Sequence, residues 1–314
     1  MKRLALLAGA GVLVTLSAGF TESGRWRLTV LERKHQGLLP HMDWAETLRG
    51  LQLCAWGDCH RRLVLGGVSL VRVDRDAPCP ALWDTPLGPM WGRLEDQTYL
   101  QYYSGKWPML AREPERYPQV KHGDVVVEAG AWIGSFTRFA LSRGASRVVA
   151  VEPEPVNADC FRKTFHEEIR EGRVVLVERA LWDRDTSVRL TNPSPERGGE
   201  STIVSKAGEI EVPATTLDAV IDELALDRVD FLNVDVEGSE RQMIAGAERT
   251  LRRFRPQVSL CTHHLPGDEE YLPGAVLAVL PDYRFVNAGL RGHFFAPERD
   301  PLYLASTVET RIEP

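Results

Sequence analysis

The chain has 314 residues, enough for one full domain with appended segments. Its 43% apolar and 26% charged residues are typical of a globular protein and exclude a wholly disordered, fibrous or polytopic membrane protein. The 38 basic and 44 acidic side chains leave a net charge of −6, which argues against a general nucleic-acid binder. Five cysteines are too few for a disulfide-built scaffold.

Residues 1–20 have the pattern of a signal peptide or a membrane anchor. Lys2 and Arg3 precede an uncharged, mostly apolar run at positions 4–20. The basic residues between positions 25 and 34 outnumber those two, so the positive-inside rule favours a body in the cytosol. We therefore expect residues 4–20 to associate with a membrane and the rest of the chain to be cytosolic. Export after signal cleavage is one alternative, and a helix packed on the protein itself is another.

Residues 21–115 are predicted to form a small accessory region of short strands and loops. Six of the eight tryptophans and three of the five cysteines lie there. The segment 62–73, RLVLGGVSLVRV, is typical of a hairpin that turns at two glycines. Cys54 and Cys59 would form a disulfide in an exported protein. In the cytosol they would be apolar fillers or a weak metal clip.

Residues 116–314 show short apolar runs that alternate with amphipathic stretches, a pattern that predicts a doubly wound α/β sheet with helices on both faces. The predicted strands are 125–127, 148–151, 174–177, 229–234 and 258–261. The predicted helices are 135–143, 155–170, 239–254 and 269–280. An insertion at 187–214 interrupts the alternation, and we expect it to form a hairpin over the site.

A glycine loop, EAGAWIG at positions 128–134, follows the first predicted strand. Gly130 and Gly134 allow the backbone to turn tightly and to approach a ligand. Neither the phosphate-binding pattern G-x-x-x-x-G-K-[ST] nor the dinucleotide pattern G-x-G-x-x-G is present. The acidic Glu128 instead favours a cationic ligand such as S-adenosylmethionine, which carries an ammonium and a sulfonium. A tight turn without a ligand is the alternative.

Three further residues are candidates for the nucleoside part of such a ligand. Glu152 ends the second strand, 22 residues after Gly130, near the spacing expected for a carboxylate that binds a ribose diol. Trp182 and Asp183 follow the third strand, where an adenine ring lies in folds of this class. Trp182 would either stack on the adenine or pack in the core.

Four segments resemble, in order, motifs of the FkbM family of S-adenosylmethionine-dependent methyltransferases. The loop within VVVEAGAWIGSFT resembles D-x-G-A-N-x-G-x-x-T, and VEPEPVN resembles V-E-P-x-P. ATTLD resembles T-x-L-D, and FLNVDVEGSE resembles L-K-I-D-V-E-G-x-E. The resemblance covers about residues 120–286 and implies a Rossmann-like methyltransferase sheet with S-adenosylmethionine as cofactor. The expected cofactor-binding residues are Glu128, Gly130, Trp132, Gly134, Glu152, Trp182 and Asp183.

The chain departs from the family pattern at three positions. Glu128 stands where the family has Asp, Trp132 where it has Asn, and Asn233 where it has Lys. Glu keeps the charge with a longer reach, whereas Trp cannot donate a hydrogen bond as Asn would. These departures put catalysis in doubt more than fold.

The catalytic candidates lie at the ends of the fourth and fifth strands. Asp235 and Glu237 are two residues apart, so an extended chain places both on one face. His263 and His264 follow the fifth strand, and an imidazole is a suitable general base near neutral pH. The family often has Glu-x-His here, with Cys261 in place of the Glu and His263 matching the His. We choose His263 and Asp235 as catalytic and assign no metal. The alternatives are a divalent metal held by these residues, structural histidines, or an aspartate that caps the next helix.

We expect an O-methyltransferase that acts on a hydroxyl of a sugar, lipid headgroup or secondary metabolite. Its partners would be a small-molecule, glycan or lipid acceptor and not a nucleic acid. The alternative is a non-catalytic nucleotide-binding module on the same fold, an idea motivated by Trp132 and Asn233. A nicotinamide oxidoreductase is a third hypothesis, which the missing dinucleotide pattern opposes.

Overall fold

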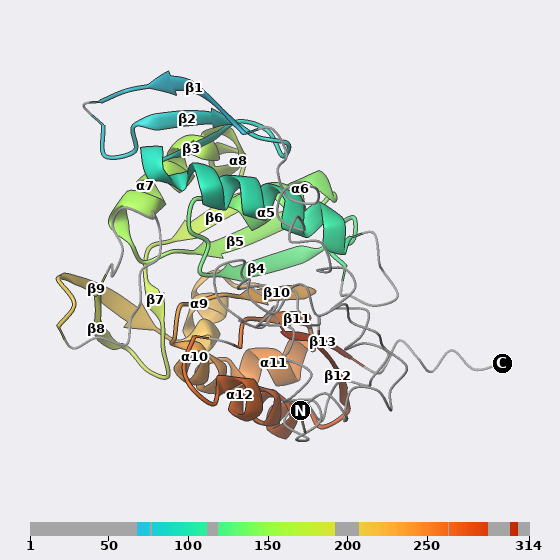
Figure 1. Ribbon diagram of the computed structural model, residues 1–314. Coiled ribbons are helices and arrows are strands. Elements are labelled where there is room, and N and C mark those ends of the chain that lie inside the picture. Colours follow the sequence, from blue (N-terminus) through green and yellow to red (C-terminus); the bar gives the residue numbers. More distant parts are fainter. Residues whose placement is uncertain are drawn as a thin grey trace, which may run out of the picture.

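A computed structural model describes residues 68–75, 77–111, 119–191, 207–262, 264–287 and 302–306 (Figure 1). The expected membrane segment 1–20, the Cys54–Cys59 pair and His263 lie outside these residues. Within the described ranges, no helix is both long enough and apolar enough to cross a membrane.

The main sheet has seven strands in the order β12-β13-β11-β10-β4-β5-β6 (Figure 1). The five strands from β11 to β6 are parallel, while β13 runs antiparallel to both β11 and β12. All five apolar runs predicted as strands are therefore confirmed. The bounds are β4 Val125–Ala129, β5 Arg147–Val151, β6 Val174–Val177, β10 Phe231–Val234, β11 Gln257–Leu260, β12 Tyr283–Asn287 and β13 Leu302–Ser306.

Helices connect these strands close to the predicted positions, but two predicted helices are divided. The segment 155–170 divides at Phe165, and the segment 239–254 divides at Gly246 and Ala247. The bounds are α5 Gln97–Leu110, α6 Ser135–Ser142, α7 Pro155–Thr164, α8 His166–Arg170, α9 Leu217–Glu223, α10 Glu240–Ala245, α11 Glu248–Phe254 and α12 Asp268–Val279. Sequence analysis did not predict α5 or α9.

Two apolar cores cover the two faces of the sheet. Val125 and Val127 of β4 belong to one core together with residues of α9–α12, whereas Val126 belongs to the other. That second core includes Phe136 of α6 and Phe161 of α7. Because neighbouring residues of a strand point to opposite faces, the two groups of helices lie on opposite faces of the sheet. The doubly wound α/β prediction is confirmed.

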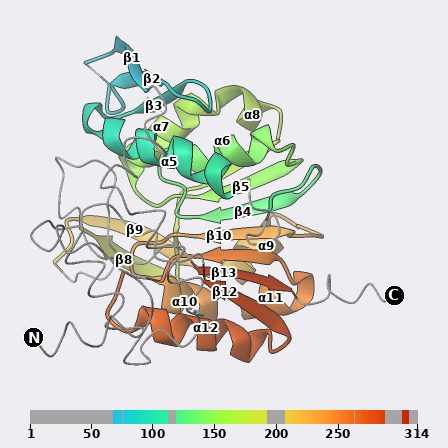
Figure 2. The same cartoon turned by 45° about the vertical axis from the view of Figure 1, so that its right-hand side comes forward.

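A second, three-stranded sheet packs on α7 at a distance from α10–α12 (Figures 1 and 2). Its strands are β1 Ser69–Val73, β2 Ala81–Asp84 and β3 Met90–Gly92, and the short helix η3, Leu94–Asp96, leads from it into α5. Strand β1 pairs with β2, so the described half of the predicted 62–73 hairpin finds its partner further along the chain. A disulfide between Cys79 and Cys160 links this sheet to α7.

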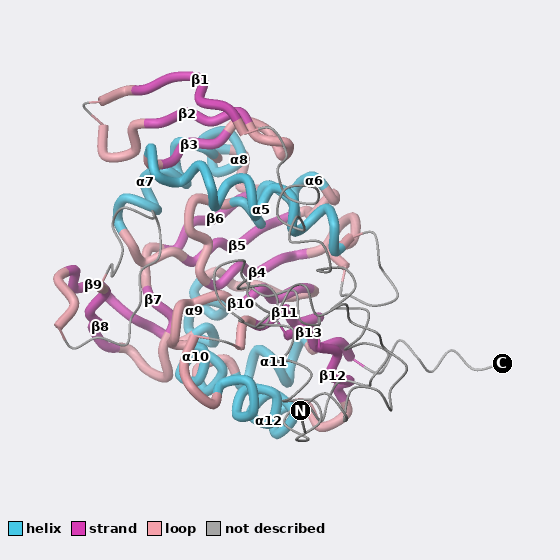
Figure 3. The backbone as a smooth tube through the Cα atoms, in the orientation of Figure 1, coloured by secondary structure: helices cyan, strands magenta, loops and turns pink. Residues whose placement is uncertain are grey.

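The insertion forms a hairpin as predicted, while its expected position over the site stays a prediction. Strands β8, Thr186–Leu190, and β9, Ile210–Thr215, pair antiparallel, and β7, Ala180–Leu181, pairs with β9. Figure 3 shows β8 and β9 projecting away from the main sheet, beside β7. Residues 192–206, between the two long strands, lie outside the described part of the chain.

Candidate active site

The strand order reverses between β4 and β10, because the chain runs from β4 to β5 on one side and from β10 to β11 on the other. Open α/β sheets bind ligands outside the carboxyl ends of their strands at such a reversal. The glycine loop after β4 lies at this point. There the backbone of Gly130 approaches that of Asp235 so closely that a Cβ on the glycine would lie 1.8 Å from the Asp235 carbonyl oxygen.

Packing within the protein explains both loop glycines. Gly130 has a φ of +82°, and its N–H group donates to the Val151 carbonyl oxygen at 3.0 Å. Gly134 has a φ of +94°, and a Cβ there would lie 2.1 Å from the ring of Phe165. The two glycines thus set the path of the loop, and their expected contact with a cofactor stays a prediction.

Glu152 stands at the carboxyl end of β5 with its side chain buried. Its carboxylate accepts hydrogen bonds from the Trp132 N–H at 2.7 Å, the Glu154 N–H at 2.9 Å and the Asn157 side-chain amide at 3.3 Å. Burial raises the pKa of Glu152 to about 7, although these donors oppose the rise. This carboxylate is fixed in place by the loop and by the start of α7.

Glu128 is also buried, but it faces the protein interior. The Thr137 hydroxyl donates to its carboxylate, which joins β4 to α6. Burial raises the pKa of Glu128 well above its usual value, and the charges of Glu152 and Asp235 add to the rise. Three carboxylates on neighbouring strands therefore lie within electrostatic reach of one another, an arrangement that favours a cationic ligand.

Trp132 divides its contacts between the loop and the accessory region. Its backbone donates to Glu152, while its indole packs on Tyr99 and Tyr103 of α5, with ring centroids 6.2 and 5.7 Å away. Its φ of +49° is uncommon for a bulky residue. The side chain that replaces the family's Asn is thus part of the packing between the loop and α5.

Trp182 and Asp183 follow β7, next to the insertion hairpin. The Trp182 side chain is partly buried and packs against the apolar cluster of β7, β8 and β9. Asp183 forms an ion pair with Arg184 at 2.9 Å. The contacts of Trp182 therefore agree with the interpretation that it packs in the core. The adenine role of both residues stays a prediction.

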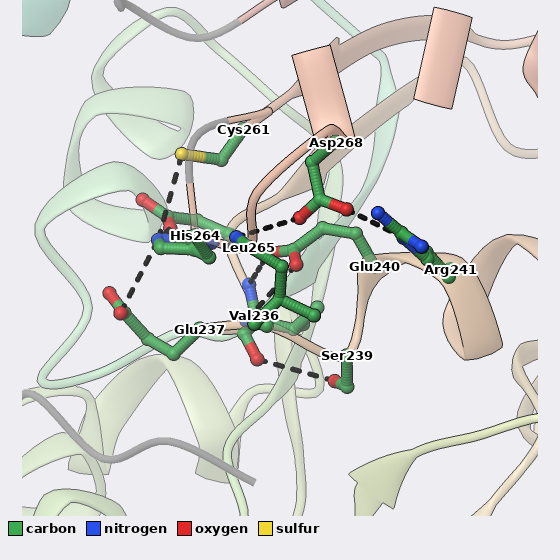
Figure 4. A network of polar contacts seen from close by, with 11 residues as sticks. Val236, Glu237, Ser239, Glu240, Arg241, Cys261, His264, Leu265 and Asp268 are labelled. Atoms are coloured by element: carbon green, nitrogen blue, oxygen red, sulfur yellow. Dashed lines mark hydrogen bonds and ion pairs between the residues drawn. The ribbon is translucent and has the colours of Figure 1, made fainter. Parts of the chain in front are cut away.

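The segments that follow β10 and β11, with the first residue of α10, bring four polar side chains to His264. Figure 4 labels three of them, Glu237, Glu240 and Cys261. The His264 Nε2 atom lies 3.4 Å from Asp235 Oδ1, 3.3 Å from Glu237 Oε2 and 3.8 Å from Cys261 Sγ. On the other side of the ring, Nδ1 lies 2.8 Å from Glu240 Oε1. His264 is therefore the centre of an acidic cluster, which we call the β10–β11 cluster: Asp235, Glu237, Glu240, Cys261 and His264.

Charges around His264 outweigh its burial. Burial alone would lower the pKa of the imidazole, but Glu237 and Glu240 help to raise this pKa well above 6.5. Burial raises the pKa of the Cys261 thiol to about 12, and the charge of Asp235 contributes. The His264 ring is therefore protonated at neutral pH and is a poor proton acceptor.

Of the two residues predicted to be catalytic, the structure describes Asp235 but not His263. Asp235 and Glu237 both lie in the β10–β11 cluster, near His264. Strand β10 ends at Val234 and Glu237 has a φ of +51°, so the alternation of an extended chain is not what brings them together. The alternative that Asp235 caps the next helix is wrong, because α10 begins at Glu240 and its N-cap residue is Ser239. Glu240 itself accepts the Val236 and Gly238 N–H groups at 3.1 and 3.0 Å. The role of His263 stays a prediction, since that residue lies outside the described ranges.

Sequence reasoning missed two residues of the site region. Glu240 ends the family block that was recognised, so its position was available as a signal. Arg93 gave no signal, because its contacts span more than 60 residues. Its guanidinium donates to the Asn157 side chain, and it pairs with Glu154 at 2.7 Å, next to Glu152. The accessory region thus supports the start of α7.

The sheet order, the acidic glycine loop and the carboxylate after β5 define a Rossmann-like methyltransferase domain. The sequence pattern of the methyltransferase FkbM domain matches residues 124–286, which is more than half of the chain. The chain therefore belongs to the FkbM methyltransferase family.

Individual relatives are more distant. The chain is 27% identical over 223 residues to the 31-O-demethyl-FK506 methyltransferase FkbM of Streptomyces tacrolimicus, covering 60% of this chain and 80% of that protein. Its fold is similar to the crystal structure of methyltransferase FkbM from Methylobacillus flagellatus KT, with a TM-score of 0.45 and 20% identity. That match covers 68% of this chain and 55% of the other. A putative RNA methyltransferase from Pyrococcus horikoshii gives a TM-score of 0.38 at 12% identity, covering 68% of this chain and 85% of that one.

Proposed function

We propose that this protein transfers a methyl group from S-adenosylmethionine to a hydroxyl of a sugar, lipid headgroup or secondary metabolite. Family membership supports methyl transfer. The name of the Streptomyces relative, a 31-O-demethyl-FK506 methyltransferase, supports an oxygen atom as the acceptor. The observation that carries the proposal is the buried Glu152 carboxylate, fixed at the carboxyl end of β5 beside the glycine loop.

The residues at the strand reversal fit this cofactor. A carboxylate can accept hydrogen bonds from both hydroxyls of a ribose, and Glu152 is held in place by three donors. The carboxylates of Glu152 and Asp235, both within electrostatic reach of the buried Glu128, suit a ligand with an ammonium and a sulfonium. When bound, the cofactor would supply an electrophilic methyl group.

The chain would contribute alignment and removal of a proton from the acceptor. We propose that Asp235 orients the acceptor and that His263 takes its proton. Replacing His263 by Ala should lower turnover about 10²–10⁴-fold while cofactor affinity is nearly unchanged. Full turnover in that variant would show that His263 is not the base.

Methyl transfer can be tested before the acceptor is known. The purified protein is incubated with extract of its host and S-adenosylmethionine labelled with tritium on the methyl group. We expect label in an extractable product, and no label when Glu152 is replaced by Ala. Cofactor binding without transfer to any fraction would instead support the non-catalytic module.

The cellular location is a separate proposal. We propose that residues 4–20 hold the protein at a membrane with the domain in the cytosol, where S-adenosylmethionine is made. A reporter fused after Pro314 should then report the cytosol. A periplasmic or secreted signal would contradict this orientation and would agree with the Cys79–Cys160 disulfide, a bond that persists in oxidising compartments.

A further inference from the structure

Three ligand-type atoms of the β10–β11 cluster converge on one point. Asp235 Oδ1, Cys261 Sγ and His264 Nε2 all lie within 4.8 Å of one another. They come from the carboxyl ends of two neighbouring parallel strands, where the Cys261 N–H donates to the Val234 carbonyl oxygen at 2.9 Å. We propose that these three side chains bind a Zn²⁺ ion.

The donor set and its spacing suit zinc. Thiolate, imidazole and carboxylate are the three side-chain ligands that Zn²⁺ uses, at about 2.0–2.3 Å in tetrahedral sites. Tetrahedral bonds of that length separate the ligand atoms by roughly 3.3–3.6 Å. The measured separations are 3.4 Å from Nε2 to Asp235 Oδ1 and 3.8 Å from Nε2 to Cys261 Sγ. The third separation, between Asp235 Oδ1 and Cys261 Sγ, is at most 4.8 Å, so these two side chains would move closer together to bind the ion.

The far side of the imidazole has the support that zinc-binding histidines show. A histidine that binds a metal through one nitrogen commonly bonds a carboxylate through the other, which fixes the ring and its tautomer. His264 Nδ1 lies 2.8 Å from the fully buried Glu240, which is itself held by the Val236 and Gly238 N–H groups (Figure 4). Nε2 is thereby directed at Asp235 and Cys261.

A second observation points to a cation at the same place. Asp235 Oδ1 is buried and accepts no hydrogen bond from the described residues; its ion-pair partner among them is the His264 ring, with Nε2 3.4 Å away. A buried carboxylate oxygen without a hydrogen bond is costly. A bound cation would satisfy it. Mg²⁺ and Ca²⁺ prefer all-oxygen ligands, so the sulfur of Cys261 and the nitrogen of His264 favour a transition metal, of which zinc takes this mixed ligand set in tetrahedral sites.

Three protein ligands leave one coordination position open, as in catalytic zinc sites. The position suits water or the hydroxyl oxygen of the methyl acceptor; this last clause rests on the proposed function. Glu237 lies outside the group of three, and its Oε2 atom is 3.3 Å from His264 Nε2. It is therefore not counted as a ligand.

Metal titration of the full chain tests the site. The purified protein is stripped with a chelator and titrated with Co²⁺, whose bond to a thiolate absorbs in the near ultraviolet. We expect one Co²⁺ per chain with thiolate absorption, and displacement by one Zn²⁺. The conservative variants Cys261→Ser and Asp235→Asn should weaken Zn²⁺ binding about a hundredfold or more, and Cys261→Ser should abolish the absorption. Circular dichroism of the metal-free variants checks that each is folded.

Two controls separate this site from others. Replacing both Cys54 and Cys59 by Ser should leave the absorption unchanged, which excludes a clip formed by that pair. His166→Ala removes an exposed histidine and should keep full affinity, whereas His264→Ala should lose it. Wild-type protein that binds no Zn²⁺, or Cys261→Ser protein that binds it equally well, would overturn the proposal.

The zinc proposal and the methyltransferase proposal can fail independently of each other. Binding of S-adenosylhomocysteine by zinc-free protein that fails to take up zinc would overturn the zinc site alone. Zinc uptake that depends on Cys261, in a protein with no nucleoside affinity, would support the zinc site and overturn the methyltransferase proposal.

Discussion

The backbone N–H of Trp132 donates to Glu152 Oε2 at 2.7 Å, although the two residues follow different strands. This bond ties the glycine loop after β4 to the carboxyl end of β5. Trp132 holds a left-handed φ of +49°, a conformation that the surrounding structure must stabilise for a residue of this size. The shape of the loop and the position of the proposed ribose-binding carboxylate therefore depend on each other.

The affinity for S-adenosylhomocysteine should rise as the pH is raised through about 7. Burial raises the pKa of Glu152 to about 7, so the free protein holds a proton there at lower pH. The ionised carboxylate accepts bonds from both ribose hydroxyls, so binding favours it and releases the proton. Calorimetry should show affinity falling up to about tenfold per pH unit below about pH 6 and levelling off above about pH 8. Glu152→Gln should lack this dependence; an equal slope in that variant would assign it to another group.

Gly130→Ala should destabilise the fold far more than Gly172→Ala. Both glycines have a positive φ, +82° and +74°, so both substitutions carry backbone strain of about 1–2 kcal/mol. Only Gly130 has a backbone atom, the Asp235 carbonyl oxygen, in the path of a new Cβ, whereas nothing lies within 4 Å at Gly172. We expect a further loss of about 1–3 kcal/mol at Gly130, measured by urea unfolding. Equal losses in the two variants would show that the backbone at Asp235 can move away from the new Cβ at little cost.

Breaking the Cys79–Cys160 disulfide should lower stability. The bond closes a loop of 81 residues between the three-stranded sheet and α7, and such cross-links typically contribute about 2–4 kcal/mol. Replacing both cysteines by Ser should reduce the free energy of unfolding by this amount, and reductant should produce the same loss in the wild type. Reductant that destabilises the double variant equally would show that another disulfide is responsible.

Arg93→Ala should cost about 3 kcal/mol of stability, because it leaves the buried Glu154 carboxylate without its cation. Arg162 is a matched control, since it forms ion pairs from α7 but is 45% exposed. Arg162→Ala should cost less than about 1 kcal/mol. Urea unfolding of the two variants measures the difference. Similar losses of stability would show that the Arg93–Glu154 pair contributes no more than an exposed ion pair.

The fold could be predicted where a short, continuous run of apolar residues marks a buried strand. The runs that became β4, β5 and β6 are continuous Val-rich segments, and such runs are typical of strands with both faces covered. Contacts between segments that are far apart in the sequence produce no such local pattern, so they could not be predicted. The Cys79–Cys160 bond spans 81 residues, and sequence spacing had pointed to Cys54 and Cys59 instead.

The site was predictable at strand ends and less so beyond them. Glu152 and Asp235 follow their strands directly, and the topology alone brings them to one edge. The choice between His263 and His264 assumed that the chain stays extended after the fifth strand. Strand β11 ends at Leu260, so alternation does not decide which ring turns toward Asp235. Local turns after a strand depend on contacts such as that between His264 and Glu240.

Calorimetric titration of S-adenosylhomocysteine into wild-type, Glu152→Ala and Glu178→Ala protein tests the central claim most directly. We predict one binding site per chain and at least tenfold weaker binding in Glu152→Ala, because hydrogen bonds to a charged group contribute about 1.5–3 kcal/mol each. The exposed Glu178 at the next strand end is the control and should bind as the wild type does. Absence of binding by the folded wild type, or equal affinity in Glu152→Ala, would contradict the account.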